Sequence, residues 1–78
     1  MADTDLLRAH IRTIWSEVLE SDDFSDETSF FAAGGDSLLL LLLRDQLNAD
    51  LPAEFSAADL FAHNSVQAQL DLLVARRG

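Results

Sequence analysis

Six consecutive leucines, Leu38 to Leu43, constrain the fold of this chain more than any other feature. The run is too short to cross a bilayer, which takes about 20 apolar residues. At about 100° per residue, six positions cover more than one helical turn, so all six side chains cannot face one core. Gly34-Gly35 before the run and Pro52 after it predict a helix from Ser37 to about Asn48.

The remaining apolar residues are also typical of helices. Most of the hydrophobic residues are Ala and Leu, and few are Val or Ile, so little is available for a sheet. Apolar positions near the N-terminus recur at helical spacing and predict a first helix with Thr4 or Asp5 as N-cap, ending between residues 19 and 21. These positions are Leu7, Ile11, Ile14, Trp15 and Val18.

Two further helices are predicted in the last third of the chain. A short one covers Ala57 to Ala62, where Ser56 and Asp59 have the spacing of a capping box. The last one starts at Asn64 or Ser65. It carries apolar residues at helical spacing and ends in Arg76-Arg77, where the helix dipole favours cations.

The connection between the first two helices, residues 21–36, is longer than most loops in compact domains. It contains five acidic residues, but also Phe24, Phe30 and Phe31, which we expect to anchor it onto the core. The sequence therefore predicts an all-α fold over residues 1–78, in one domain. The expected architecture is a small four-helix bundle, with three long helices, one short helix and a long loop between helices 1 and 2.

Charge and composition exclude several functions. Fourteen acidic residues against five basic ones give a net charge of −9, which disfavours nucleic acid and anionic membranes and favours partners with positive or mixed patches. The chain has no cysteine, hence no disulfide and no thiolate metal site. Residues 1–5 lack the basic start of a secretory signal, so we expect a cytoplasmic protein. A chain this short is also an improbable enzyme.

Ser37 is the candidate functional residue. It follows two glycines and Asp36 at the start of the leucine helix, where free N–H groups and the helix dipole favour negative charge. A hydroxyl in this position is well placed to carry a phosphate ester. The alternative is that Ser37 is only the N-cap of the helix.

The leucine helix divides into a core side and an outer side. Leu40, Leu43 and Leu47 form one stripe and are predicted to face the core. Leu38 and Leu41 are expected near Ser37 on another face. Leu39 and Leu42 either dock on neighbouring segments or enlarge an exposed apolar patch; we favour a hydrophobic docking face.

Three motifs together resemble a known family. They span about Leu6 to Val74 and are similar to the thiolation domain, or peptidyl carrier protein, of nonribosomal peptide synthesis, a relative of the acyl carrier proteins. Two residues depart from the family pattern, Ala33 and Asn64, and both concern packing. The motifs are Phe30-Phe31-Ala32-Ala33-Gly34-Gly35-Asp36-Ser37-Leu38, Ile14-Trp15-Ser16-Glu17-Val18-Leu19, and Asp59-Leu60-Phe61 with Ser65-Val66.

The resemblance implies a carrier that is not itself an enzyme. A phosphopantetheinyl transferase, with coenzyme A and Mg²⁺, would attach 4'-phosphopantetheine to Ser37, and the thiol of the arm would hold aminoacyl, peptidyl or acyl groups as thioesters. Asp36, Leu38 and Leu41 would take part in partner recognition. The implied partners are the transferase, an adenylation enzyme, and condensation, tailoring or thioesterase enzymes, met by a monomer.

Three alternatives remain at this point. One is an acyl carrier protein of polyketide or fatty-acid type, although such carriers tend to have several acids along the second helix. Another is an unmodified acidic helical adaptor. The third is an esterase, because Gly35-Asp36-Ser37-Leu38 spells a hydrolase signature. That chemistry also needs a histidine base, for which only His10 and His63 are present, and we expect these to be surface or boundary residues.

Overall fold

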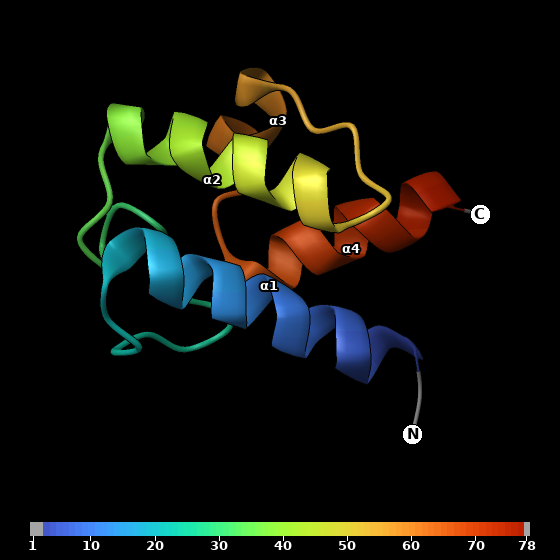
Figure 1. Ribbon diagram of the computed structural model, residues 1–78, viewed down its shortest axis with the longest axis horizontal. Coiled ribbons are helices and arrows are strands. Elements are labelled where there is room, and N and C mark those ends of the chain that lie inside the picture. Colours follow the sequence, from blue (N-terminus) through green and yellow to red (C-terminus); the bar gives the residue numbers. More distant parts are fainter. Residues whose placement is uncertain (1–2, 78) are drawn as a thin grey trace.

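Four helices make up the computed structural model, which describes the backbone of residues 3–77 and the side chains of residues 3–76. They are α1 (Asp3–Leu19), α2 (Ser37–Asp50), the short α3 (Ala57–Ala62) and α4 (Val66–Arg77). The described residues contain no strand, so the predicted all-α bundle is confirmed. In Figure 1, α1 packs against both α2 and α4, and α3 covers the other side of α2.

The ends of α1 and α2 differ in part from the predictions. Thr4 and Asp5 lie within the first turn of α1, not at its N-cap, so that prediction was wrong; the dipole accepts acidic residues there as well. At its other end Glu20 adopts a left-handed φ of 54° and stops the helix. The second helix runs on to Asp50, because only Leu51, the residue before Pro52, is held in extended backbone.

The short helix begins at Ala57 as predicted, whereas the last helix begins at Val66, just after the predicted Asn64 or Ser65. Ser56 and Asp59 form a complete capping box at the start of α3, with each side chain accepting a backbone N–H of the other residue. Before α4, the Ser65 hydroxyl oxygen accepts the Ala68 N–H at 3.1 Å. The prediction that the helix dipole favours Arg77 at the C-terminal end of this helix concerns a side chain that lies outside the described residues.

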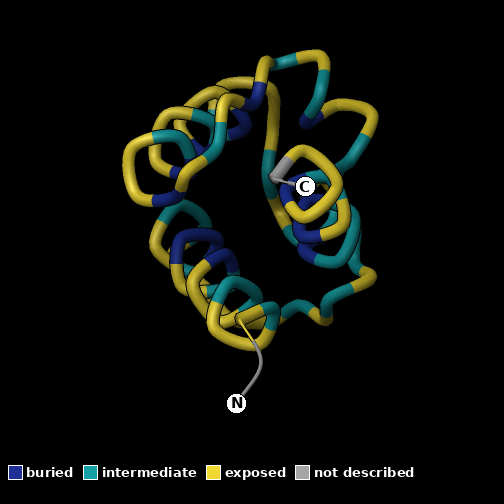
Figure 2. Tube along the Cα trace, turned by 90° about the vertical axis from the view of Figure 1, so that its right-hand side faces the viewer, coloured by how far each residue is buried: buried dark blue, intermediate teal, exposed yellow. Residues whose placement is uncertain are grey.

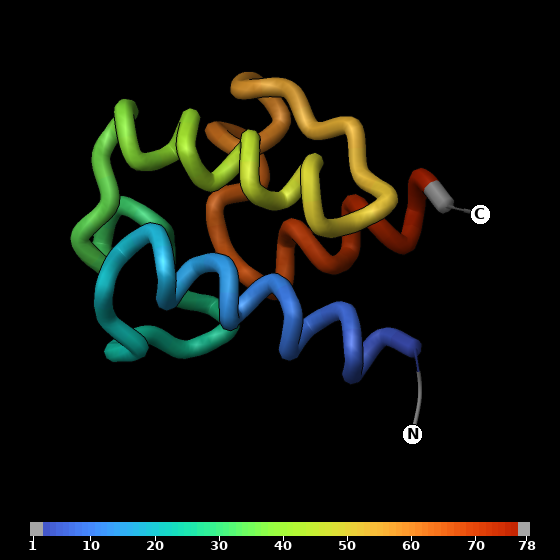
Figure 3. The backbone as a smooth tube through the Cα atoms, in the orientation of Figure 1, coloured from blue at the N-terminus to red at the C-terminus, as the bar shows by residue number. Residues whose placement is uncertain are grey.

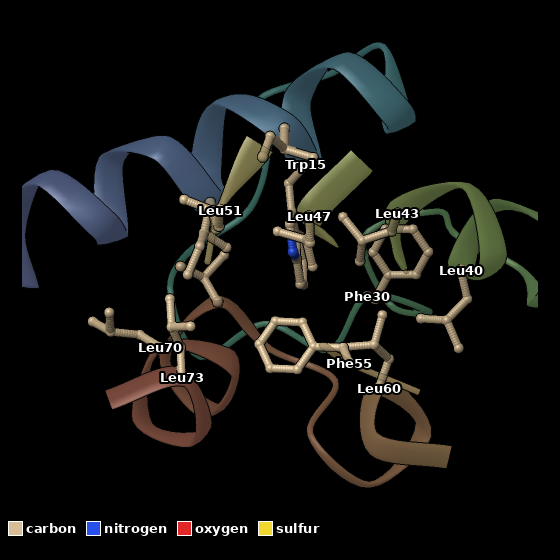
Figure 4. Packing of buried hydrophobic residues seen from close by; sticks show 13 residues of the cluster. Trp15, Phe30, Leu40, Leu43, Leu47, Leu51, Phe55, Leu60, Leu70 and Leu73 are labelled. Carbon is tan, nitrogen blue, oxygen red and sulfur yellow. The ribbon is translucent and has the colours of Figure 1, made fainter. Parts of the chain in front are cut away.

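The core lies between the helices, with the buried residues turned toward the centre (Figure 2). Leu40, Leu43 and Leu47 are fully buried, as predicted. Trp15 is also fully buried, and its indole N–H donates to the buried Gln69 Oε1 at 2.9 Å, which joins α1 to α4 by the polar bond that a buried indole requires. The close view in Figure 4 labels Trp15, Phe30, Leu40, Leu43, Leu47, Leu51, Phe55, Leu60, Leu70 and Leu73.

The long connection packs against the bundle, as expected, and closes the end at which α1 stops and α2 begins (Figure 3). Asp26 accepts a hydrogen bond from Arg12 at 2.6 Å and pairs with Arg8 at 3.2 Å, which ties the connection to α1. Its carbonyl accepts the Gln67 N–H of α4 at 2.9 Å. Because the connection is bonded to both α1 and α4, it can fix the position at which α2 begins.

Candidate functional site at the start of α2

Ser37 is the first residue of α2 and is exposed. The N-cap is Asp36, whose Oδ1 accepts the Leu39 N–H at 2.9 Å. The alternative that Ser37 itself caps the helix is therefore wrong. Across the described residues no hydrogen bond engages the Ser37 hydroxyl, so its oxygen is available for chemistry.

The two glycines before the helix are required for different reasons. Gly34 has a φ of +110°, which L side chains rarely adopt. A Cβ on Gly35 would overlap the ring of Phe30, and the Gly35 N–H donates to the Phe30 carbonyl at 2.9 Å. The backbone leading to Ser37 is thus pressed directly onto a core aromatic ring.

Phe30 is fixed on its other sides as well. Its ring meets Trp15 edge to face, with centroids 5.1 Å apart, and its N–H donates to the Asn64 carbonyl at 2.7 Å. Asn64 therefore contributes a backbone oxygen, which any residue supplies. The departure from the family pattern at this position leaves that contact in place.

The electrostatics of this helix start suit a phosphate ester. The first N–H groups of a helix have no partners within it, and the dipole places partial positive charge there. Asp36 takes up one of these donors, the Leu39 N–H, while the hydroxyl of Ser37 lies in the first turn and is exposed. The residues present therefore fit a phosphodiester on Ser37 Oγ.

The outer side of α2 is apolar. Leu38 is 72% exposed and Leu41 37%, so both leucines predicted to meet partners are accessible. Their neighbours Leu39 and Leu42 differ from each other: Leu39 packs against the core, whereas Leu42 is 51% exposed. The sequence analysis treated these two leucines together and did not predict this difference.

Phe31 does not anchor the connection in the core, so that expectation was wrong. It is partly exposed and stacks on Phe61 of α3, with ring centroids 5.8 Å apart at 20°. Since Phe30 already fills the core, its neighbour points outward. Two adjacent aromatics in an irregular segment are the only sequence signal for this surface pair.

The residues that an esterase needs are not assembled. His10 is exposed and His63 half-buried, as expected of surface and boundary residues. Within residues 3–76 no hydrogen bond joins either imidazole to Ser37 or to a carboxylate, and no group of three metal-ligating side chains occurs. Over the same described residues no helix is long and apolar enough to span a membrane.

Comparison with known families gives a match over most of the chain. The family described as "Phosphopantetheine attachment site" matches residues 9–73. This range includes all four helices in whole or in part, and it includes Ser37.

Curated relatives are large synthetases. Polyketide synthase PksN of Bacillus subtilis is 36% identical over 55 residues, 70% of this chain and 1% of that protein. Hybrid PKS-NRPS synthetase TAS1 of Botryobasidium botryosum is 36% identical over 72 residues, 91% of this chain and 4% of that protein. The chain thus spans only a few hundredths of the length of these relatives.

Solved structures share the fold. BlmI, a type-II acyl carrier protein from Streptomyces verticillus, superimposes with a TM-score of 0.87 at 25% identity, covering 96% of this chain and 90% of BlmI. A free-standing peptidyl carrier protein from Acinetobacter baumannii gives a TM-score of 0.85 at 20% identity, covering 97% and 98%.

Proposed function

The chain belongs to the phosphopantetheine attachment family, as a carrier domain of the kind found in polyketide and nonribosomal peptide synthetases, and from this premise we propose that Ser37 is its attachment residue. Domains of this family attach 4'-phosphopantetheine covalently. The arm ends in a thiol that carries an acyl, aminoacyl or peptidyl group as a thioester.

One observation carries the assignment of Ser37. The capping role at the start of α2 is filled by Asp36, which leaves the Ser37 hydroxyl exposed and without a structural task among the described residues. The adaptor alternative gives Ser37 no function beyond capping, and that function belongs to its neighbour.

The loading reaction uses this hydroxyl as nucleophile. The Ser37 oxygen attacks the pyrophosphate phosphorus next to pantetheine, a P–O bond of coenzyme A breaks, and 3',5'-ADP leaves with the released electron pair. The hydroxyl proton passes to a base of the transferase, because no histidine among the described residues is hydrogen-bonded to Ser37. In this reaction the chain is the substrate, and its own contribution afterwards is tethering, which raises the effective concentration of the cargo.

The chain itself is proposed to be non-catalytic and of the peptidyl subtype. After its first turn, α2 carries acidic residues only at Asp45 and Asp50, and Arg44 pairs with Asp45 at 3.1 Å. That charge pattern offers little to the basic partners of fatty-acid-type carriers. Proposed partners are a phosphopantetheinyl transferase, an adenylation enzyme, and condensation, tailoring or thioesterase enzymes.

Intact-mass spectrometry tests the attachment residue. The chain is incubated with coenzyme A, Mg²⁺ and a broad-specificity phosphopantetheinyl transferase, beside Ser37→Ala and Ser21→Ala, the latter removing another exposed serine. We expect the mass of one phosphopantetheine on the unaltered chain and on Ser21→Ala, and none on Ser37→Ala. Loading of a folded Ser37→Ala would overturn the assignment, and no loading of the unaltered, helical chain would favour the adaptor.

A further inference from the structure

A hollow lies along the seam between α1 and α2. Glu17 and Val18 of α1 form one wall, Leu42 and Gln46 of α2 form the other, and its volume is about 260 Å³. Leu42 is 51% exposed, although its neighbour Leu43 is fully buried. The wall therefore presents an apolar side chain that the fold itself does not cover.

The size of the hollow limits its occupant. Sites for small molecules and cofactors have volumes of roughly 300–1,000 Å³, larger than this one. A single large apolar side chain from another protein matches the space and would cover Leu42 and Val18. Side chains that fill a pocket of the partner in this way are the ones that contribute most to binding at protein interfaces.

The negative charge of Glu17 in the α1 wall indicates which charged group of the partner should lie beside that apolar side chain. Glu17 forms no ion pair with any other described residue, whereas each arginine whose side chain is described already pairs with a carboxylate. Those pairs are Arg8 and Arg12 with Asp26, Arg44 with Asp45, and Arg76 with Asp59. No described arginine is therefore left to pair with Glu17, and its exposed carboxylate is accessible to a cation of a partner.

The hollow is separate from the surface around the attachment residue. Leu42 lies five residues beyond Ser37, roughly 7.5 Å along the helix axis and about 140° around it. Leu41 is turned by only about 40° from Ser37 and therefore lies on another side of α2. A segment seated at Leu42 would hold the domain beside Ser37 without covering it.

We propose that the hollow formed by Glu17, Val18, Leu42 and Gln46 is a docking site for a partner-protein segment that presents one large apolar side chain and an adjacent Lys or Arg. The apolar side chain packs on Leu42 and Val18, and the cation meets Glu17. This proposal rests on the carrier function in one respect, because it takes the segment to belong to a protein that the carrier visits.

The test uses the ¹⁵N-labelled chain, without the arm, and three helical peptides of one otherwise constant sequence. The first peptide carries leucine and arginine one turn apart, the second serine and arginine, and the third leucine and glutamate. We expect only the first to shift the amide resonances of the four residues of the hollow, and the shifts to weaken at high salt. No shift of these resonances at millimolar peptide, or equal shifts with all three peptides, would overturn the proposal.

Matched variants identify the binding wall. Leu42→Gln should weaken binding of the first peptide about tenfold, because a packed apolar side chain is lost. Leu6→Gln, which alters an exposed leucine about three turns from Glu17 along α1, should leave the affinity unchanged. The Glu17→Lys variant should no longer bind the leucine–arginine peptide and should bind the leucine–glutamate peptide instead. Glu54→Lys, which replaces an exposed glutamate elsewhere, should change the binding of neither peptide. Equal binding by Leu42→Gln, or shifts gathered at the hollow of Leu51 and Phe55 instead, would contradict the assignment.

The outcome can be separated from that of the loading experiment. Peptide binding is measured without the arm, so failure of Ser37 to accept phosphopantetheine would leave the docking result standing. Conversely, an unaltered chain that loads normally and binds none of the peptides would reject the docking site alone.

Discussion

The two sides of α2 use the same side chain for different purposes. Leu40, Leu43 and Leu47 are fully buried against the other helices, whereas Leu38, Leu41 and Leu42 are 72%, 37% and 51% exposed. The helical period alone separates the two sets. The difference teaches that leucine on this helix is a residue of stability or of recognition according to its position in the turn.

The same division occurs where the helix begins. Phe30 and Gly35 are pressed together on the core side, and Asp36 closes the helix end. The adjacent Ser37 is exposed. Neighbouring residues can therefore be compared as pairs, one held by the fold and one left to solvent.

The largest effect is expected from Leu43→Ala. Removing a fully buried leucine costs about 2–5 kcal/mol, because apolar burial is lost and a cavity remains. Small domains are stable by only about 5–15 kcal/mol, so the midpoint of urea unfolding should fall sharply.

The matched control is Leu42→Ala. Its side chain is half exposed, and we expect its free energy of unfolding to stay within about 0.5 kcal/mol of the unaltered chain. Similar losses for Leu42→Ala and Leu43→Ala would mean that the two sides of α2 are not distinct.

How far the sequence predicts this division depends on whether a residue's surroundings are local. Leu40 and Leu43 could be assigned to the core because the stripe they form needs only the helical period. The same period also separates Leu39 from Leu42, because Leu39 lies about 70° and Leu42 about 130° from the centre of that stripe. The hollow at Glu17 could not be predicted in this way, because residues of two helices form it.

The site itself was more predictable than its details. Ser37 at the start of the helix follows from the glycines and from the leucine run, both of which are local signals. Which residue caps the helix was not decided, because Asp and Ser are about equally good N-caps and stand side by side. Phe31 was misplaced for a related reason: the sequence shows two aromatics but not that the core has room for one.

Gly35→Ala is expected to have the second-largest effect. The new methyl group would overlap the Phe30 ring, and crowding of this kind costs about 1–3 kcal/mol. Phe30→Leu should partly relieve that loss, so the two changes should be clearly non-additive in urea unfolding.

Gly34→Ala provides the comparison for that double mutant. Open space surrounds Gly34, and its substitution is costly only because of its backbone φ of +110°. Phe30→Leu should give it no relief, and the two changes should add within about 0.5 kcal/mol. Relief of Gly34→Ala to the same degree would show that Phe30 does not act through a contact with Gly35.

A smaller effect is expected at the cap. Asp36→Ala should lower the free energy of unfolding by about 1 kcal/mol, because the Leu39 N–H loses its acceptor. Ser37→Ala should lie within about 0.5 kcal/mol of the unaltered chain, since its hydroxyl caps nothing. A loss of stability from Ser37→Ala as large as that from Asp36→Ala would contradict the division of roles.

Asp36→Asn separates capping from recognition. Asparagine caps as well as aspartate, so stability should be retained, while the charge available to a transferase is removed. We expect slower phosphopantetheine loading of this variant in a time course of intact mass. Unchanged loading would leave Asp36 with the capping role alone.

The smallest effect concerns the ion pair that joins α3 to the last turn of α4, an exposed attachment that contrasts with the apolar packing under α2. Arg76 donates to both carboxylate oxygens of Asp59, at 2.7 and 2.9 Å, and the Ser56 N–H donates to the same carboxylate. Chiefly through Arg76, and then through Ser56, these donors hold the pKa of Asp59 well below its usual range. Because the pKa is lowered in the folded state, this contribution to stability is complete above the ordinary aspartate value of about 4 and is lost as the pH falls below it.

Arg76→Gln tests whether this exposed pair contributes at all. The variant should raise the pKa of Asp59 toward about 4, as followed by NMR titration of its carboxyl group. It should also be slightly less stable than the unaltered chain near neutral pH, and the difference should shrink in acid and at high salt. A difference that stays constant between neutral and acidic pH would mean that Arg76 acts by packing its stem against α3. In that case apolar contact would hold α3 to α4, as it holds the buried side of α2, and the ion pair would contribute nothing to stability.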